Sequence, residues 1–186
     1  SDVKKVQNRS LNEPLIYKNP IIEDLTKSMD AFVEEKKSSK DFPPGAAVCI
    51  VRNGALIMED AYGVKNVDSA DSVDVHTVFR LASLSKTFAS FLSAMLVEEQ
   101  YFGWDDPVVE YLPEFRLKNT SSTDQLTIRH VLSQTTGLPR HAYTNFVEEG
   151  MSNEDMIRAL GEVEVIARPG EVYSYQNVAY SLIECR

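Results

Sequence analysis

The apolar residues in the first part of the chain predict a helix that begins near Pro20. Asn19 and Pro20 provide a cap and a first-turn proline, whereas residues 1–19 show no period and are expected to run over the surface. The apolar positions that then recur at helical spacing are Ile21, Ile22, Leu25, Met29, Phe32 and Val33.

Two β-type runs follow this helix and predict a hairpin. They are AAVCIV (residues 46–51) and ALIMEDAYG (residues 55–63), joined through Asn53-Gly54. A type I′ turn needs positive φ at both central residues, and Asn-Gly is the dipeptide that best supplies it. The chain is therefore expected to open with a helix and two antiparallel strands.

From residue 84 onward the apolar pattern has the period of a helix. One apolar face is formed by Phe88, Phe91, Leu92, Met95 and Leu96. A second helix fits residues 127–137, with Thr127 as its cap and Gly137 as its left-handed end. A third is expected to start at Ser152, whose pairing with Asp155 resembles a capping box, and a last one near Asn177.

Composition and charge indicate a globular protein and exclude several classes of partner. The 186 residues are 43% apolar and 25% charged, which is typical of a folded domain. A net charge of −9 argues against nucleic acid or an anionic membrane as a partner. The longest uncharged helical run, Thr87 to Val97, is too short to span a bilayer. The chain starts with Ser1, so the lack of a leader says nothing about export.

The cysteines and histidines give no sign of a metal site. Cys49 and Cys185 are interpreted as small core residues and not as a disulfide. His76, His130 and His141 are isolated, and no Cys/His spacing suggests zinc. We expect no cofactor.

The first candidate for chemistry is the pair Ser83 and Lys86 in FRLASLSKTFASF (residues 79–91). An S-x-x-K spacing is common by chance, and Ser1-Asp2-Val3-Lys4 is one such match. Ser83, however, lies where a loop turns into a helix, near exposed backbone N–H groups. A serine nucleophile needs an adjacent base, and a lysine with a lowered pKa can be that base. Ser85 points to another face and is the lesser candidate.

The second candidate is Tyr175-Gln176-Asn177, which follows a Pro-Gly turn and leads into a helix. A tyrosine can relay a proton where nearby cations lower its pKa, and an asparagine can orient a carbonyl or an amine. The alternative interpretation is a tyrosine-rich packing corner, to which we assign Tyr173 and Tyr180.

Three motifs in this order, FRLASLSK, RHVLSQTTGLPR and PGEVYSYQN, resemble the serine β-lactamase and penicillin-binding-protein superfamily, and its class C β-lactamase-like branch in particular. The resemblance covers residues 43–186. It implies that Ser83 attacks a carbonyl to form an acyl-enzyme, that Lys86 accepts its proton and that Tyr175 shuttles protons. It further implies that Asn177 binds the substrate's amide and that the backbone N–H of Ser83 is one oxyanion donor.

The resemblance also implies an α+β multidomain protein of the β-lactamase/transpeptidase-like fold. Residues 1–75 would be the N-terminal part of an α/β domain, and residues 76–186 a mainly helical domain with both motifs. The family's third motif, Lys/His-Thr/Ser-Gly, is missing, and the last helical segment ends at Arg186 without a stop signal. We therefore expect the C-terminal strands of the α/β domain to be absent from this chain.

The expected function is that of a serine acyl-hydrolase, with β-lactam hydrolysis first. A D-alanyl-D-alanine carboxypeptidase or a carboxylesterase carries the same motifs, and a non-catalytic binding or assembly module is the alternative of another class. The implied partners are a small substrate (a β-lactam, a D-Ala peptide or an ester) and the remaining C-terminal part of the protein. The implied location is the bacterial periplasm or outside the cell. An α/β-hydrolase is disfavoured because no G-x-S-x-G occurs.

Residues 1–186 expressed alone are expected to be unstable or to aggregate. An isolated hairpin is marginal in water, and its unpaired strand edges invite intermolecular pairing. Thermal melting followed by circular dichroism, with light scattering, checks this. A cooperative transition of a monomer would contradict the expectation.

Overall fold

The computed structural model describes residues 20–36, 38–39, 42–144 and 149–184. The chain separates into two compact units, residues 1–80 and 81–186, with the boundary between Arg80 and Leu81. That boundary falls a few residues beyond the one expected at 75/76. The assignment of the first unit to an α/β domain and of the second to a helical domain stays a prediction.

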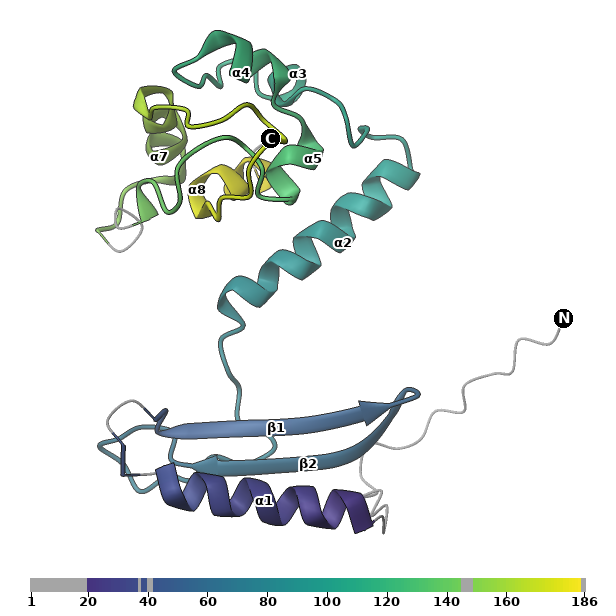
Figure 1. Cartoon of the computed structure of the whole chain (residues 1–186), viewed down its shortest axis with the longest axis vertical. Coiled ribbons are helices and arrows are strands. Elements are labelled where there is room, and N and C mark those ends of the chain that lie inside the picture. Colours follow the sequence, from purple (N-terminus) through teal and green to yellow (C-terminus); the bar gives the residue numbers. More distant parts are fainter. Residues whose placement is uncertain (1–19, 37, 40–41, 145–148, 185–186) are drawn as a thin grey trace, which may run out of the picture. The chain divides into compact units, whose positions relative to one another are not determined.

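The first unit contains the expected helix and hairpin. Helix α1 spans Pro20–Lys36, and strands β1 (Gly45–Arg52) and β2 (Ala55–Gly63) pair antiparallel. The helix runs alongside the hairpin (Figure 1). Asn53 and Gly54 have φ values of 52° and 75°, the two positive angles that the Asn-Gly turn requires.

One face of the hairpin is the better covered. Met58 is buried, and Ile50, its partner across the sheet, is half-buried on the same face. Tyr62 lies on this face too, where burial and the nearby Asp60 and Asp30 carboxylates raise its pKa to about 12. Asp30 belongs to α1, so this face is the one that α1 approaches.

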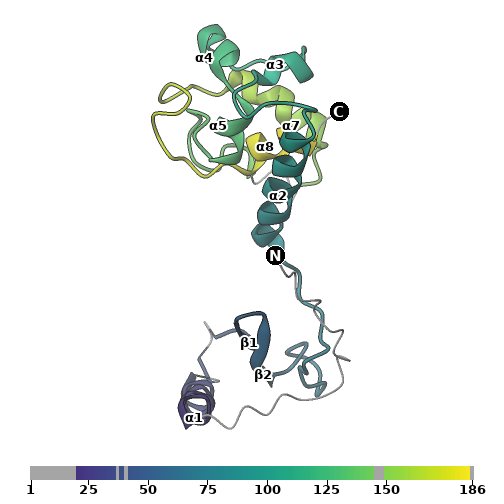
Figure 2. The same ribbon diagram turned by 90° about the vertical axis from the view of Figure 1, so that its right-hand side faces the viewer.

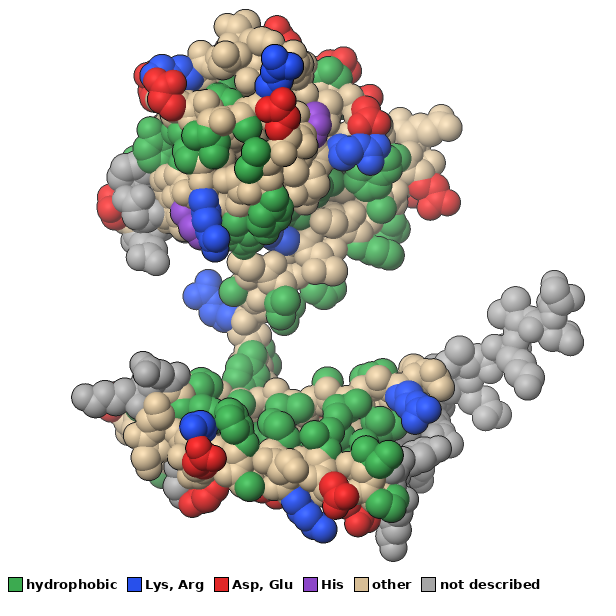
Figure 3. All heavy atoms as spheres, in the orientation of Figure 1, with side chains coloured by type: hydrophobic (Ala, Val, Ile, Leu, Met, Phe, Trp, Pro, Cys, Tyr) green, Lys and Arg blue, Asp and Glu red, His purple; other side chains and the backbone are tan. Residues whose placement is uncertain are grey.

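The interpretation of Cys49 as a buried core residue is wrong, because the structure exposes it. Cys49 shares the opposite face of the hairpin with Ala47 and Val51, both also exposed. In a two-stranded sheet, alternate residues point to opposite faces, and only one face packs on α1. Figure 3 shows apolar side chains at the surface of this unit. Cys185 lies outside the described residues.

The second unit consists mainly of short helices. Its elements are the 3₁₀ turn η1 (Ala82–Leu84), α2 (Ser85–Glu98), α3 (Val108–Tyr111), α4 (Thr120–Gln125), α5 (Ile128–Leu132), α7 (Asn153–Ala159), η2 (Leu160–Glu162), α8 (Asn177–Tyr180) and η3 (Ser181–Glu184). Helices α5, α7 and α8 are grouped together (Figures 1 and 2). They enclose a core in which Leu126, Val131, Leu138, Leu160 and Val178 are almost fully buried.

Side-chain caps begin two of these helices where the sequence predicts them. The Thr127 hydroxyl accepts from the backbone N–H of His130, and Ser152 accepts from that of Asp155. The prediction that Gly137 ends the second helix is wrong. Helix α5 ends at Leu132, and the chain adopts a left-handed conformation (φ 60°) at Gln134.

The apolar face predicted for α2 exists, but the described residues leave most of it exposed. Phe88, Phe91 and Leu92 are each more than half exposed, and Met95 is 45% exposed. Periodicity therefore predicted the helix correctly, whereas the burial of its face depends on what packs against it.

Gly137→Ala should destabilise the complete protein more than Gly150→Ala does. Both glycines have φ near 80°, but a Cβ at Gly137 would lie 2.2 Å from the Ala167 carbonyl oxygen, whereas a Cβ at Gly150 would meet no atom of the described residues within 4 Å. The unfavourable φ costs each variant about 1 kcal/mol. The close contact should cost Gly137→Ala about 1–3 kcal/mol more. Denaturant unfolding measures the difference, and equal losses would contradict the argument.

Candidate active site

Ser83 and Lys86 are positioned by the start of α2. Ser83 lies in the turn η1 immediately before the helix, and Lys86 is the second residue of α2. Ser83 is exposed and Lys86 is half-buried. The sequence predicted a serine at the junction of loop and helix, and the structure places Ser83 there.

Tyr175 and Asn177 are positioned by the loop that leads into α8. Tyr175 precedes the helix by two residues, and Asn177 is its first residue. Both side chains are half-buried, while Gln176 between them is completely buried. The alternation of exposure indicates that Tyr175 and Asn177 point to one side and Gln176 to the other.

The four candidate residues converge in one hydrogen-bonded chain. The Tyr175 hydroxyl donates to Ser83 Oγ at 2.7 Å. Lys86 Nζ donates to the Tyr175 hydroxyl at 2.9 Å and to Asn177 Oδ1 at 2.8 Å. The structure gives no direct hydrogen bond between Ser83 and Lys86, both of which it describes. Tyr175 is therefore the residue in contact with the hydroxyl of Ser83.

The Lys86 ammonium dominates the electrostatics of this cluster. Its Nζ lies 5.0 Å from the centre of the Tyr175 ring and 5.3 Å from that of Tyr180, distances at which cation–π attraction operates. The hydrogen bond from Lys86, followed by that with Ser83, lowers the pKa of Tyr175, and these effects outweigh the opposing effect of burial. A phenol with a lowered pKa is suited to exchange protons with a neighbouring hydroxyl.

Tyr180 contributes more to this site than the sequence indicated. We assigned it to packing, and it is indeed buried, but its hydroxyl also donates to the backbone carbonyl of Lys86 at 2.8 Å. The same hydroxyl lies 2.9 Å from Ser90 Oγ. Helix α8 is thereby hydrogen-bonded to the first turns of α2. The packing role expected for Tyr173 is wrong, because its side chain is 67% exposed.

The residue before the candidate nucleophile has an unusual backbone conformation. Ala82 has a φ of 46°, in the left-handed region that residues other than glycine, asparagine and aspartate seldom adopt. Such strain is found at functional sites, where the surrounding structure maintains it. Here it accompanies the turn that presents Ser83 to solvent.

His141 also lies against the cluster, which the sequence did not predict. Its ring centre is 5.5 Å from that of Tyr175, and its backbone N–H donates to the Tyr175 carbonyl at 3.0 Å. An isolated histidine gives no sequence signal of such a contact.

A hollow of about 210 Å³, lined by Ser85, Lys86 and Asn177 among others, opens beside the Lys86 side chain.

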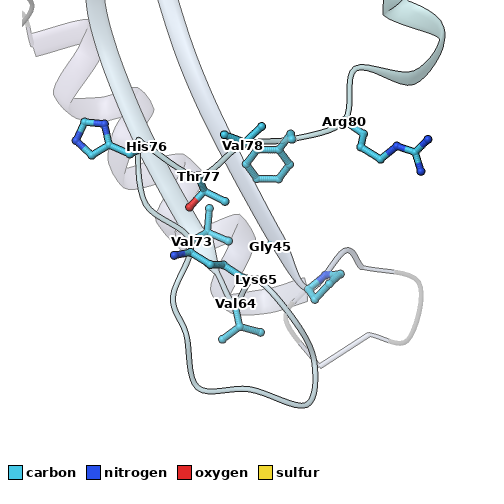
Figure 4. A pocket seen from close by; sticks show the side chains of 10 residues that line it. Gly45, Val64, Lys65, Val73, His76, Thr77, Val78 and Arg80 are labelled. Carbon is cyan, nitrogen blue, oxygen red and sulfur yellow. The ribbon is translucent and has the colours of Figure 1, made fainter.

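A larger hollow of about 530 Å³ lies within the first unit, lined by residues that include Val64, Val73 and Phe79. Arg80 lines it too but extends away from the other labelled side chains (Figure 4). The turn beside it is held by Asp74, which accepts from the Thr77 hydroxyl and the His76 backbone N–H. These bonds lower the pKa of Asp74. The Thr77 hydroxyl in this hollow is bonded to the Asp74 carboxylate, and the structure gives it no hydrogen bond to Lys65 or His76, which also line the hollow.

The described part of the chain offers neither a metal site nor a membrane-spanning helix. It contains no group of three or more His, Cys, Asp or Glu side chains arranged to hold a metal ion. No helix among its residues is long and apolar enough to cross a bilayer.

Comparison with known proteins identifies the family. The family model Beta-lactamase matches residues 29–185, and the chain belongs to this family. Protein flp of Staphylococcus aureus (strain MW2) is 28% identical over 162 residues, which cover 86% of this chain and 32% of that protein. The chain thus spans about a third of the length of this curated relative.

Solved structures give the fold. The octameric penicillin-binding protein homologue from Pyrococcus abyssi has a TM-score of 0.71 at 24% identity, covering 87% of this chain and 37% of that one. EstCE1, a hydrolase with promiscuous acyltransferase activity, has a TM-score of 0.74 at 23% identity, covering 89% of this chain and 47% of that one. The expected fold class is confirmed: the chain forms part of an α+β β-lactamase/transpeptidase-like fold.

Lys86→Met should raise the pKa of Tyr175 towards its ordinary value near 10, because it removes the hydrogen bond and the charge that lower it. Ser83→Ala should raise the pKa less. Titration of the tyrosine ¹³Cζ signals by NMR, assigned with Tyr175→Phe, measures the shift. Lys65→Met in the first unit serves as the control, and an unchanged pKa in Lys86→Met would contradict the assignment.

Proposed function

We propose that the protein is a serine acyl-hydrolase in which Ser83 forms an acyl-enzyme. The observation that carries this proposal is the hydrogen-bonded chain from Ser83 Oγ through the Tyr175 hydroxyl to Lys86 Nζ. Membership of the β-lactamase family supports it. Such a chain connects a nucleophile to a base and the base to a charged partner, which is what activation of a serine requires.

The proton of Ser83 passes to Tyr175. With Tyr175 neutral and Lys86 charged, the phenol donates to Ser83 and cannot accept a proton. Loss of one proton from the Tyr175–Lys86 pair gives either a phenolate beside an ammonium or a phenol beside an amine. Both forms can receive the serine proton, directly or by relay. The resemblance implied that Lys86 itself accepts this proton, whereas in this proposal Lys86 is part of the base through its hydrogen bond to Tyr175.

The reaction then proceeds in two balanced steps. Ser83 Oγ bonds to the substrate carbonyl carbon while its proton moves to Tyr175, and the scissile C–N or C–O bond breaks as Tyr175 returns this proton to the leaving atom. Water attacks the carbonyl carbon of the resulting ester, and one of its protons passes to the same pair. The pair returns this proton to Ser83 Oγ as the acyl C–O bond breaks and the acid product leaves. The side-chain NH₂ of Asn177 is directed towards the substrate, while Lys86 donates a hydrogen bond to Asn177 Oδ1.

We propose β-lactams as the first substrate class, because the three sequence motifs resemble those of the class C β-lactamase-like branch. D-Ala peptides and short esters are the alternatives, and EstCE1 is a hydrolase of the same fold. Mass spectrometry of the complete protein after reaction with a penicillin, a D-Ala-D-Ala peptide or a short-chain ester separates them by the adduct on Ser83. We propose a periplasmic or secreted location on the same resemblance.

Ser83→Ala and Lys86→Ala should each lower the acylation rate of the complete protein by at least about 10³-fold. Residues that act as one unit are non-additive, so the double variant should be little slower than either single one. The rate of wild type should increase with pH, because Tyr175, whose pKa is lowered, accepts the serine proton once the phenol has lost its own. Stopped-flow measurement with a chromogenic β-lactam or ester gives each rate.

Ser85→Ala is the matched control for the nucleophile and should acylate at a near-normal rate. If Ser85→Ala abolishes acylation and Lys86→Ala does not, the nucleophile has been misassigned. If no probe acylates either serine, the non-catalytic binding module replaces this proposal.

A further inference from the structure

Two buried glutamines hold the segment that carries Tyr175 and Asn177. Gln176 lies within this segment, and Gln134 contacts it from another part of the chain. Gln176 is completely buried and Gln134 is 6% exposed. Buried amides are retained where their hydrogen bonds have a purpose, because burial without partners is costly. Gln134 belongs to SQTTG, a stretch to which the sequence assigned no chemistry.

Gln134 holds the two residues on either side of Tyr175. Its backbone carbonyl accepts from the N–H of Ser174 at 2.8 Å, and its side-chain Oε1 accepts from the N–H of Gln176 at 2.7 Å. The left-handed conformation of Gln134, with φ of 60°, accompanies these paired contacts. The backbone on both sides of Tyr175 is therefore attached to a single residue.

Gln176 holds the start of the helix that bears Asn177. Its Oε1 accepts from the N–H of Val178 at 3.0 Å, which caps α8, and its Nε2 donates to the Pro139 carbonyl at 3.3 Å. Both polar ends of this side chain are thus used. For Gln134, by contrast, the structure gives no hydrogen bond from Nε2 to any described residue.

We propose that Gln134 and Gln176 are positioning residues that fix the directions of the Tyr175 phenol and the Asn177 amide towards Lys86 and Ser83. This inference rests on the proposed acyl-hydrolase function. Neither glutamine touches the reacting atoms. The side chain of Gln134 acts through its acceptor oxygen Oε1 alone. The side chain of Gln176 acts through both its oxygen Oε1 and its nitrogen Nε2. This difference predicts how each responds to substitution.

Gln134→Met and Gln176→Met keep the length of the side chain and remove its hydrogen bonds. A displacement of about 1 Å in a catalytic group can lower a rate about 100-fold, so we expect kcat to fall by roughly 10- to 100-fold in each, with a smaller change in KM. The rates of the complete protein are measured per active site, counted by stoichiometric acylation. Gln125→Met, at an exposed glutamine, is the matched control and should match wild type.

Substitution of each glutamine by glutamate tests the acceptor oxygen and the donor nitrogen of the side chain separately. Gln134→Glu keeps an oxygen facing the N–H of Gln176 and should restore most of the kcat lost in Gln134→Met. Gln176→Glu loses the donor and places an oxygen against the Pro139 carbonyl, so it should be slower than Gln134→Glu. Equal rates for the two glutamates, or a Gln134→Glu no faster than Gln134→Met, would overturn the proposal.

The titration of Tyr175 gives a readout that does not depend on turnover. If Gln134 directs the phenol towards Lys86, Gln134→Met should raise the pKa of Tyr175, as followed by ¹³Cζ NMR. A merely structural role would lower the melting temperature but leave this pKa and the kcat per active site unchanged, and that result overturns the proposal. If Gln134→Met does not fold, Gln134→Asn, which withdraws the acceptor by one methylene, replaces it.

The two proposals fail separately. If wild type is not acylated by a penicillin, a D-Ala-D-Ala peptide or an ester, the proposed function fails. The positioning inference then stands if Gln134→Met raises the pKa of Tyr175, and it falls if this pKa is unchanged.

Discussion

The candidate site depends on one interaction, the simultaneous hydrogen bonding of the Lys86 ammonium to Tyr175 and Asn177. These bonds join positions 89 and 91 residues apart in the sequence. An ammonium is a strong donor and is strongly hydrated, so it is held away from bulk water only where fixed acceptors replace its water. Two acceptors and two aromatic rings provide that replacement here. Helix α8, which begins with Asn177, packs against α5 and α7, and this packing keeps the acceptor groups in place.

That constraint explains why so much of the second unit consists of short, capped elements. A long helix offers one face at a fixed spacing, whereas the site needs groups from η1, α2 and the loop before α8 at a single point. The loop residues are held by side-chain and backbone hydrogen bonds from SQTTG and from Gln176, above a core that includes Leu138 and Val178. Precision in a loop comes from such bonds, since a loop has no regular ladder of its own.

Much of this arrangement could be predicted from the sequence, because local rules determine it. The Asn-Gly turn, the Thr127 and Ser152 caps and the helical period after residue 84 depend on neighbours in the chain, and each was correct. The four site residues came from motif order. Other features depend on contacts between distant segments: the exposure of Cys49 and Tyr173, the early end of α5, and the hydrogen bonds of Tyr180 and Gln134. No periodicity records those contacts.

The left-handed Ala82 gives the site a trade-off between stability and activity. A glycine at this position would relieve the strain in the folded chain, and selection for thermal tolerance would favour such a change. The same change would widen the range of backbone conformations open to the adjoining serine. In a library screened for heat resistance alone, position 82 would therefore accumulate substitutions that raise thermal stability and leave Ser83, the candidate nucleophile, less well oriented.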